Sequence, residues 1–546
     1  CFFDFSPFFA HSPSRSFNLL VNFLLVISGK WLNLSRQDYQ KNSLLNDLHF
    51  GFFWFGSHIG LFILGFFLQK DDRSLDNLNV IGFSVWTSRG AGLCLAYDGA
   101  LILLPVCRNI IRYLRALSFL NKIIPFDENL WFHRQTAYSM LFWTLVHTFA
   151  HYINFWKLEQ FGLFQAWQLH YTTWAGLTGH FMLLIMVLMY TSAHHNMRHQ
   201  SFETFWYTHH LAFFFMLCLY LHGHGCFVKT AQGVCKGYFS WRYTTTGGII
   251  YFLERILREI RARQPTQITK VIAHPSKAIE IQFDKPSFRY KAGQYLFLNV
   301  PAISTWQWHP FTITSAPDDP FVSVHVRLVG DFTNKLGEFL GCDSNSDKKF
   351  APAVLPTLRI DGPYGAPAED VFKNEIAILI GCGIGVTPFA SILKNIWHQQ
   401  QKRGLLKLKR VEFFWICRET GSFEWFQSLL KTLEATQMEA GFLKFHIYLT
   451  SKLRESTINN IIINDVSGSY DPLTDLESRT HYGRPNFSHI FSQLNRAIES
   501  GRYIPGKEGD LNTNVGVYYC GPPALAKSLK KRLRICKYRR YKLPLP

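Results

Sequence analysis

The sequence predicts a multi-domain membrane protein in which a bundle of six transmembrane helices precedes an antiparallel β-barrel and a parallel α/β domain. Three observations lead to this fold class. Most of the 50 phenylalanines lie in the first 260 of the 546 residues, within apolar stretches long enough to cross a bilayer. Short alternating β-branched runs begin near residue 263. From about residue 373, buried-strand runs alternate with helical sequence.

Five apolar stretches and a weaker sixth are expected to span the membrane, because a membrane helix needs roughly 20 mainly apolar residues. They are 50–68, 90–107, 132–155, 174–193, 205–222 and the shorter 243–253. Basic residues follow the second, fourth and sixth spans, so the positive-inside rule places those loops in the cytosol. The N-terminus and the domains after residue 262 are then cytosolic too, below a plasma membrane or an endomembrane.

These changes in the residue pattern along the sequence divide the chain into four segments. Residues 1–45 are left unassigned, 46–262 form the transmembrane domain, 263–370 the barrel and 371–546 the α/β domain. The net charge of +19 does not imply a nucleic acid partner, because a basic tail from Lys530 onward supplies much of it. The 11 cysteines contain no C-x-x-C pair, which argues against zinc, iron–sulfur and dithiol chemistry.

Histidines are concentrated in the membrane half, where 12 of the 22 lie between residues 130 and 225. His133 and His147 are 14 residues apart on the third expected span, and His209 and His222 are 13 apart on the fifth. At about 1.5 Å per residue, each helix offers one imidazole near each membrane face. Two such helices can hold two stacked b-type haems, each bound by one histidine from either helix. The alternative is a set of interhelical hydrogen bonds.

Two more polar residues are expected at the outer ends of these spans. His151 lies one turn beyond His147, and Arg89 opens the second span, which runs inward. A snorkelling arginine is one interpretation of Arg89. The other is a positive charge that favours a newly formed anion beside the outer haem. We therefore treat Arg89 and His151 as candidate catalytic residues.

Eight short motifs occur in order along the chain. They are "LILLPVCRN" at 101–109, "FWYTHH" at 205–210, "HPFTITSAP" at 309–317, "HVRLVGDFT" at 325–333, "DGPYG" at 361–365, "GCGIGVTPFASILK" at 381–394, "YGRPN" at 482–486 and "CGP" at 520–522. With the paired histidines, they resemble the NADPH oxidase family, in particular its calcium-independent, phagocyte-type branch. The resemblance implies a ferredoxin-reductase-like FAD-binding barrel and an NADPH-binding α/β domain.

The flavin site is implied by the motif "HPFT". By resemblance, Phe311 stacks on the flavin ring and Thr312 faces its reactive nitrogen, which makes Thr312 a candidate catalytic residue. Positive charge and a helix start near the FAD phosphates suit an anion. The residues assigned to FAD are His309, Pro310, Phe311, Thr312, Arg327 and Thr333. Taken alone, the motif equally describes an ordinary strand end.

The nucleotide site is implied by a strand, a glycine-rich turn and a helix start around residue 381. Glycines there let the backbone approach a pyrophosphate, although an ordinary tight turn has the same pattern. By resemblance, two arginines hold the 2′-phosphate and Cys520 is a candidate catalytic residue beside the nicotinamide. The residues assigned to NADPH are Gly381, Gly383, Gly385, Thr387, Pro388, Arg418, Arg484, Cys520 and Gly521. Taken singly, the arginines also suit surface charges and Cys520 suits a buried thiol.

In order, these sites predict electron transfer from cytosolic NADPH through FAD and two haems to molecular oxygen on the opposite side, giving superoxide. Hydrogen peroxide is the alternative product, because the loop 223–242, with His224, could retain the superoxide and supply protons. A ferric or cupric reductase and a non-catalytic membrane relative are the competing interpretations, the second because of the basic tail after Lys530. The resemblance also implies cytosolic activators, including a small GTPase, together with a small membrane subunit.

Overall fold

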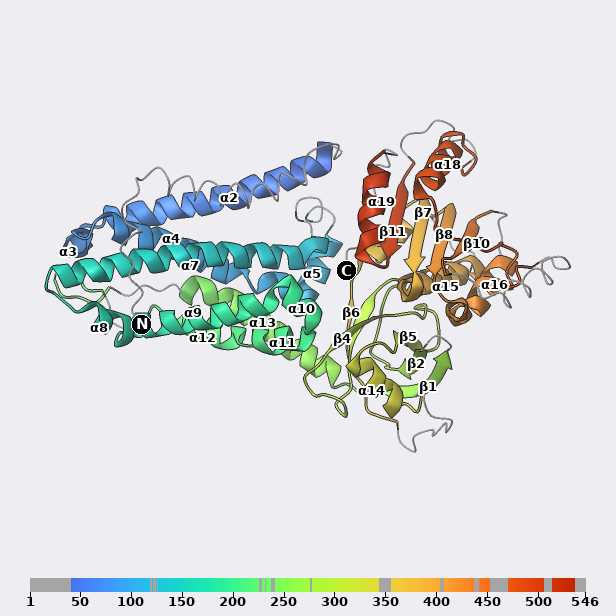
Figure 1. Cartoon of the computed structure of the whole chain (residues 1–546), viewed down its shortest axis with the longest axis horizontal. Helices are drawn as coiled ribbons and strands as arrows, with labels where there is room; N and C mark the ends of the chain where they lie inside the picture. Colours follow the sequence, from blue (N-terminus) through green and yellow to red (C-terminus); the bar gives the residue numbers. More distant parts are fainter. Residues whose placement is uncertain are drawn as a thin grey trace.

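A helical bundle and two sheet-containing units make up the chain (Figure 1). The computed structural model describes residues 41–117, 120, 124, 126–224, 228–230, 232–236, 241–274, 277–342, 355–402, 407–436, 441–451, 470–504 and 513–535. Most of the unassigned segment 1–45 and the end of the basic tail lie outside these residues.

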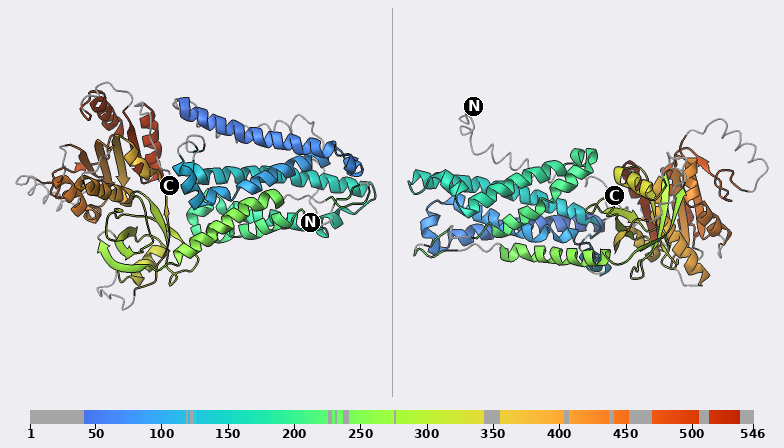
Figure 2. Two further views of the ribbon diagram at one scale, coloured as in Figure 1. Left: turned by 180° about the vertical axis from the view of Figure 1, so that it is seen from behind. Right: turned by 90° about the horizontal axis from the view of Figure 1, so that it is seen from below.

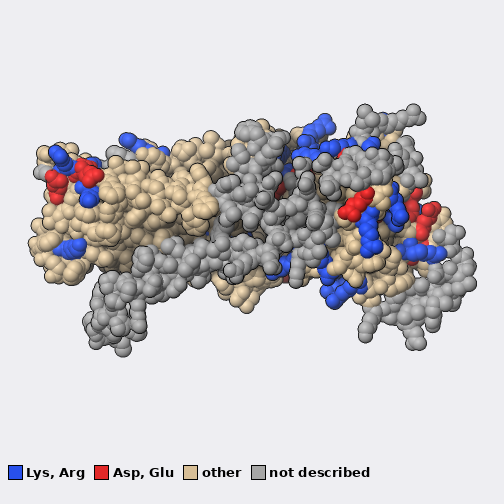
Figure 3. All heavy atoms as spheres, turned by 90° about the horizontal axis from the view of Figure 1, so that it is seen from above, with Lys and Arg blue, Asp and Glu red and all other residues tan. Residues whose placement is uncertain are grey.

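The bundle is built from the helices that occupy the expected spans. They are α2 (Lys41–Lys70), α4 (Phe83–Leu101), α7 (Asn129–Gln160), α9 (Trp174–Ala193), α11 (Phe202–His209), α12 (Ala212–Leu221) and α13 (Trp241–Ala262). Further helices lie between them: α3 (Asp76–Asn79), α5 (Arg108–Ala116), α8 (Ala166–Tyr171) and α10 (His195–Gln200). Large apolar side chains cover the outside, with Phe52 75% and Phe213 70% exposed. Figure 3 shows this part as largely uncharged, as a lipid-facing surface requires.

By length and composition, three of the described helical stretches can cross a membrane: Gly51–Lys70, Phe83–Val106 and Trp174–Ala193. The expected count of six stays a prediction, although helices occupy the other three expected positions. The second span begins at Phe83 rather than at residue 90, so Arg89 lies inside α4 instead of opening it. The sixth expected stretch lies within the longer helix α13, which has a polar first turn and charged last turns.

A short tight turn interrupts the fifth expected span between α11 and α12. The N–H groups of His210, Leu211 and Phe213 donate to carbonyls three residues earlier, at 3.2, 3.1 and 3.1 Å. This 3₁₀ geometry turns the chain further per residue than an α-helix does. In a continuous α-helix, His209 and His222 would point about 140° apart. The extra rotation reduces that offset and brings both histidines toward α7.

The barrel consists of two antiparallel three-stranded sheets. Sheet order is β1-β2-β5 in one and β4-β3-β6 in the other. Their strands are β1 (Gln267–His274), β2 (Ala278–Asp284), β3 (Tyr295–Asn299), β4 (His309–Thr312), β5 (Val322–Arg327) and β6 (Arg359–Tyr364), and α14 (Asp331–Phe339) follows β5. A bridge between Ile313 and Val324 joins the sheets, and fully buried Ile281, Leu296 and Val324 lie in the core. The predicted antiparallel barrel is confirmed.

The α/β domain has one parallel sheet with the strand order β10-β9-β8-β7-β11. Its strands are β7 (Ile376–Cys382), β8 (Arg410–Cys417), β9 (Leu443–Leu449), β10 (His481–Tyr482) and β11 (Val515–Cys520). Its helices are α15 (Thr387–Gln401), α16 (Gln427–Ala435), α18 (Phe487–Glu499) and α19 (Pro523–Ile535). The central strand β8 buries Phe413 and Trp415. The predicted parallel α/β domain is therefore confirmed.

Charged contacts join the bundle to the barrel. Helix α13 runs from the bundle to the barrel (Figure 2), and its Arg258 Nε donates to Asp361 Oδ2 of β6 at 2.7 Å. Arg115 of α5 reaches Asp370 at 3.2 Å. Close to α11, Gln307 donates to Glu203 at 3.2 Å. The strand that carries the "HPFT" motif therefore begins beside the helix that carries His209.

Candidate functional site

His133 and His209 face each other at the barrel end of the bundle. Their ring centroids are 6.2 Å apart, at 74°. His133 Nδ1 lies 2.8 Å from the carbonyl oxygen of Ile102, just past the end of α4. A hydrogen bond from Nδ1 leaves the Nε2 lone pair for a metal. His209 Nδ1 is buried and has no hydrogen-bond partner among the described residues.

His147 and His222 form the second pair, toward the other end of the bundle. Their ring centroids are 6.4 Å apart, at 59°. His147 Nδ1 lies 2.9 Å from the carbonyl oxygen of Ser88. His222 Nδ1 lies 2.9 Å from Thr178 Oγ1, and that hydroxyl donates to its own helix through Trp174 O at 2.8 Å. Both Nε2 atoms are therefore left as ligands.

The geometry of both pairs suits an iron porphyrin clamped between two imidazoles. Two metal–nitrogen bonds of about 2 Å each, plus two ring radii, account for centroid separations of this size. The rings of the second pair lie against glycines of neighbouring helices: a Cβ on Gly92 would make an ordinary contact with His147 Cε1 at 3.5 Å, and one on Gly179 would make a tight contact with His222 Cε1 at 3.3 Å. The four predicted ligands are thus brought together in the predicted combination.

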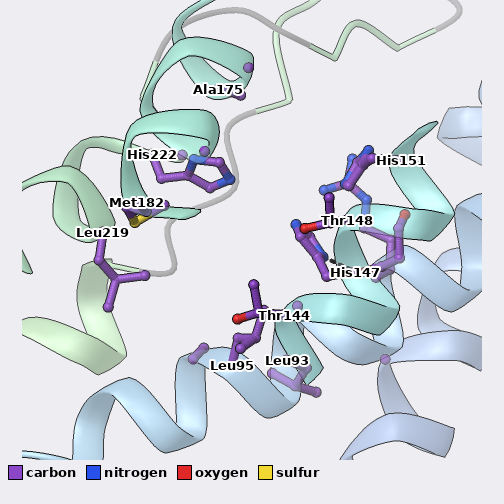
Figure 4. A pocket seen from close by; sticks show the side chains of 18 of the residues that line it. Leu93, Leu95, Thr144, His147, Thr148, His151, Ala175, Met182, Leu219 and His222 are labelled. Carbon is purple, nitrogen blue, oxygen red and sulfur yellow. Dashed lines mark hydrogen bonds between the residues drawn. The ribbon is translucent and has the colours of Figure 1, made fainter. Parts of the chain in front are cut away.

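A cavity of about 560 Å³ lies between His147 and His222 (Figure 4). His147 and His151 are on one side of it and His222 is on the other. Its wall includes Leu93, Leu95, Thr144, Thr148, Met182 and Leu219. Cofactor cavities commonly measure about 300–1,000 Å³ and are mostly apolar. Size and lining therefore fit a flat apolar macrocycle.

Arg89 and His151 line the same cavity as the second histidine pair. His151 lies one turn beyond His147, with ring centroids 4.5 Å apart. A cation and an imidazole thus share a space with both expected ligands. Both residues thus lie beside the outer pair, Arg89 inside α4 instead of at its start, and their catalytic role stays a prediction.

Several residues of this cavity were not found from the sequence. His170 and His180 line it, and Tyr152 Oη lies 2.9 Å from His180 Nε2. Ser88 and Thr178 anchor the histidines, as described above. A hydroxyl side chain on a neighbouring span at the depth of a histidine is the signal that would have indicated Thr178, whereas Ser88 holds His147 through its backbone carbonyl, which no side-chain pattern marks.

In the barrel, His309 and Arg327 present unpaired nitrogen atoms near the start of α14. The ring of His309 stacks on Phe332 of α14, with centroids 3.8 Å apart. Burial lowers the pKa of His309, which favours its neutral form. His309 Nε2 and Arg327 Nε are buried without a hydrogen-bond partner among the described residues. Buried polar atoms normally have partners, so these two fit a ligand with acceptor oxygens, such as a diphosphate.

The other residues assigned to FAD differ in their exposure and in the hydrogen bonds that they already make. Phe311 and Thr312 are half-buried and Pro310 is exposed, so a ring can reach them. Thr333 Oγ1 accepts from the N–H groups of Val329 and Gly330, at 3.1 and 3.0 Å. That hydroxyl is committed to closing the start of its own helix. Thr333 therefore shapes the loop beside Arg327.

In the α/β domain, the glycine-rich turn brings the ends of β7 and β11 together. Gly383 has φ +54°, a backbone conformation that glycine adopts readily. A Cβ on Gly385 would lie 2.4 Å from Cys520 O, and one on Gly381 would lie 3.1 Å from Val386 Cα. Only glycine lets the turn lie this close to the backbone of Cys520 and Val386. The turn is therefore compact and leaves room for a dinucleotide at the edge of the sheet.

The remaining nucleotide residues surround the same edge of the sheet. Arg418 follows β8 and Arg484 follows β10, both exposed, while Thr387 and Pro388 are buried at the start of α15. Cys520 pairs in register with Gly381 and precedes Gly521. Burial raises the pKa of Cys520 to about 11, so the group is a neutral thiol at physiological pH.

Three family models match successive parts of the chain. They are described as a ferric reductase like transmembrane component at residues 99–220, an FAD-binding domain at 263–368 and a ferric reductase NAD binding domain at 375–533. The matches follow the order of the bundle, the barrel and the α/β domain.

Curated relatives align with most of the chain. NADPH oxidase 1 of Mus musculus is 36% identical, covering 88% of this chain and 89% of that protein. A superoxide-generating NADPH oxidase heavy chain of Dictyostelium discoideum is 40% identical, covering 83% and 87%. NADPH oxidase 3 of Homo sapiens is 34% identical, covering 88% and 93%.

Proposed function

The chain belongs to the NADPH oxidase family, and from that premise we propose how its residues move electrons from NADPH to oxygen. It is a transmembrane NADPH oxidase, an oxidoreductase with an FAD-binding and an NADPH-binding domain. The family inferred from the motifs is thereby confirmed. The domain boundaries after residues 45, 262 and 370 remain our proposal, supported by family matches that begin at residues 263 and 375.

The cytosolic residues bind and orient two cofactors. Bound FAD would supply the conversion of a two-electron hydride from NADPH into the single electrons that haem iron requires. We assign the FAD phosphates to His309 and Arg327, whose buried nitrogen atoms need acceptors. Phe311 and Thr312 hold the flavin ring beside α11. The residues assigned to FAD are His309, Pro310, Phe311, Thr312, Arg327 and Thr333.

NADPH lies across the carboxyl edge of the parallel sheet in this proposal. The three turn glycines admit the pyrophosphate, and the guanidinium groups of Arg418 and Arg484 bind the 2′-phosphate. Cys520 borders the nicotinamide as an uncharged thiol, which suits a site that must exclude water and competing anions. The residues assigned to NADPH are Gly381, Gly383, Gly385, Thr387, Pro388, Arg418, Arg484, Cys520 and Gly521.

Two b-type haems are proposed in the bundle, the inner one on His133 and His209 and the outer one on His147 and His222. The observation that carries this assignment is the pair of centroid separations, 6.2 and 6.4 Å, with anchored Nδ1 atoms on three of the four rings. These four histidines would hold the two haems, which would supply single-electron transfer across the bundle. Oxygen then receives electrons in the outer cavity.

Superoxide is the proposed product. Arg89 and His151 line the outer cavity, where a guanidinium favours an anion formed from neutral oxygen. One-electron transfer gives this anion directly, whereas peroxide requires a second electron and protons. The named relatives include superoxide-generating enzymes, which supports the same product here.

The proposed orientation places both cofactor domains in the cytosol. Basic loops on the barrel side of the bundle support it. Cys235, in the loop that precedes α13, is disulfide-bonded, as is usual on an oxidising side. From the family resemblance we further propose cytosolic activators, including a small GTPase, together with a small membrane subunit. The membrane is the plasma membrane or an endomembrane.

A reduced-minus-oxidised spectrum of the purified full chain tests the proposal. Wild type is expected to show low-spin b-type absorbance and NADPH-driven dye reduction that superoxide dismutase abolishes. His147→Leu should lose the outer haem and oxygen reduction. His210→Leu is the matched control, because this exposed residue adjoins His209 yet bonds its own helix through Trp206 O. Absence of haem absorbance in wild type, or ferric chelate reduction without superoxide, would contradict the proposal.

A further inference from the structure

Three ionisable side chains gather on one face of the barrel, apart from the residues assigned to FAD. They are His274 at the end of β1, Glu280 on β2 and His325 on β5. Glu280 lies directly opposite His325 in the antiparallel ladder. His274 lies diagonally across from Glu280, because its own register partner is Ala278. Residues two apart on a strand share a face, so all three side chains meet.

The nitrogen–oxygen distances within this cluster are longer than hydrogen-bond distances. His274 Nε2 lies 3.7 Å from Glu280 Oε2, and His325 Nε2 lies 3.8 Å from the same oxygen. One ligand atom from each residue fits within 4.8 Å of the others. Two metal–ligand bonds of about 2.1 Å at a tetrahedral angle span about 3.4 Å. The two imidazole–carboxylate distances are close to this span, and the two imidazoles, which lie within 4.8 Å of each other, would move closer on binding one ion.

Both Nε2 atoms are buried, and neither has a hydrogen-bond partner among the residues that the structure describes. Two unpaired imidazole nitrogens directed at one carboxylate are costly without a ligand. His325 is only 5% exposed and Glu280 8%. A bound ion would satisfy all three groups at once.

The other polar side-chain atoms of His325 and Glu280 are already held, as those of metal ligands usually are. Thr314 Oγ1 lies 2.9 Å from His325 Nδ1 and 2.8 Å from Ser323 Oγ. Gln282 Nε2 donates to Glu280 Oε1 at 3.1 Å. These contacts fix the orientations of His325 and Glu280 and leave Nε2 and Oε2 directed at the shared space.

The α/β domain covers the cluster. The ring of Phe426 lies 4.6 Å from that of His325. Lys394 of α15 is the positive charge that acts on both Glu280 and His325. Asp319, 3.8 Å from Lys394 Nζ, offsets that charge. An ion here would therefore brace the barrel where the two cytosolic domains meet.

We propose that His274, Glu280 and His325 form a binding site for a divalent transition-metal ion, with zinc as the best-fitting ion and water as its fourth ligand. Two imidazoles and a carboxylate are ligands that zinc accepts in tetrahedral geometry. We propose a structural role for the site: none of its three residues is assigned to FAD, although Arg327, which is, lies two positions from His325 on β5. Its effect is on stability, since an ion that binds only the folded state raises the free energy of unfolding.

Zinc titration of the purified, chelator-treated full chain tests the site. Wild type is expected to regain one zinc ion per flavin, with a higher midpoint for thermal release of flavin. His274→Gln and Glu280→Gln should each weaken zinc binding by at least about tenfold, while the flavin content without zinc stays unchanged. His446→Ala is the matched control, because His446 Nε2 bonds Glu412 directly at 2.6 Å and leaves no room for an ion.

Equal zinc binding by wild type and the Gln variants overturns the proposal, and so does loss of zinc in His446→Ala alone. If the Gln variants fail to fold, X-ray absorption at the zinc edge of wild type decides without them. Two imidazole ligands with oxygen are expected, and sulfur ligation excludes this site. None of these measurements depends on haem content or oxygen reduction.

Discussion

His58 Nε2 lies 3.0 Å from Asp98 Oδ1 within the helical bundle, where the two side chains are 5% and 0% exposed. His58 Nδ1 lies 2.8 Å from Trp54 O. Both ring nitrogens therefore face acceptors, as in a protonated histidine paired with a carboxylate. An acid in a membrane helix needs such a partner. α2 and α4 are tied together by this contact.

Removal of one member of this pair should cost more than removal of both. His58→Ala leaves Asp98 buried without its cation, and breaking a buried pair costs about 3–5 kcal/mol. The double variant His58→Leu with Asp98→Leu should restore much of the loss, because neither charge remains. Thermal unfolding of detergent-solubilised protein measures both. A double variant less stable than His58→Ala would contradict the ion-pair interpretation.

Thr178→Val should disturb the outer histidine pair without unfolding α9. The valine removes the group that orients His222 through Nδ1, and loss of such an orienting bond weakens metal binding by about 10–100-fold. Haem content and the midpoint potential of the outer haem are the measurements. Thr191→Val is the control, because Thr191 Oγ1 bonds only within its own helix, to Val187 O at 2.7 Å and Leu188 O at 3.1 Å. Equal effects of the two variants would argue against the assigned role.

Arg89→Met should slow oxygen reduction and leave flavin reduction intact. The guanidinium lines the outer cavity, where it favours an anionic product, and loss of one such group costs about 10²-fold in rate. Stopped-flow mixing with oxygen follows reoxidation of the reduced protein, while NADPH-driven flavin reduction is the internal control. Arg89→Lys should retain part of the rate. A rate unchanged in Arg89→Met would leave Arg89 as a snorkelling residue.

Arg418→Ala should reduce the preference for NADPH over NADH. A charge-assisted hydrogen bond contributes about 1.5–3 kcal/mol, so we expect KM for NADPH to rise about tenfold or more. KM for NADH and kcat should change little, since neither involves the 2′-phosphate. Arg496→Ala, on exposed α18, is the surface-charge control. A parallel loss with both nucleotides would exclude a 2′-phosphate contact.

Stability should rise with pH between about 8 and 10.5 because of Lys285. Its Nζ donates to Arg261 O and Ile360 O at 2.8 and 3.0 Å, and burial lowers its pKa from 10.5 to about 8. The folded state then binds fewer protons than the unfolded chain across that range, so the free energy of unfolding increases. Lys285→Met should flatten this rise. Lys291→Met, at an exposed position, should not.

Local patterns predicted the architecture and which histidines face each other in pairs, whereas contacts between distant segments were not predictable. Apolar length located the helices, and the 14-residue spacing of His133 and His147 indicated their common role. The partner of Asp98 lies 40 residues away, and nothing local marks His58 as that partner. The cluster around Glu280 depends on the register of three strands. The extent of α13 was missed because a helix held by protein at one end need not be apolar there.

Helix α13 leaves lipid and reaches the barrel without a break, and Arg258 and Lys285 fasten its last turns to β6. We expect this continuous helix to be rigid. The FAD-binding barrel should then keep a fixed position relative to the bundle. We therefore expect any movement relative to the bundle to be a displacement of the α/β domain. The distance between probes attached to α18 and β2 would change with that displacement, whereas the distance between probes attached to α13 and β6 would stay constant.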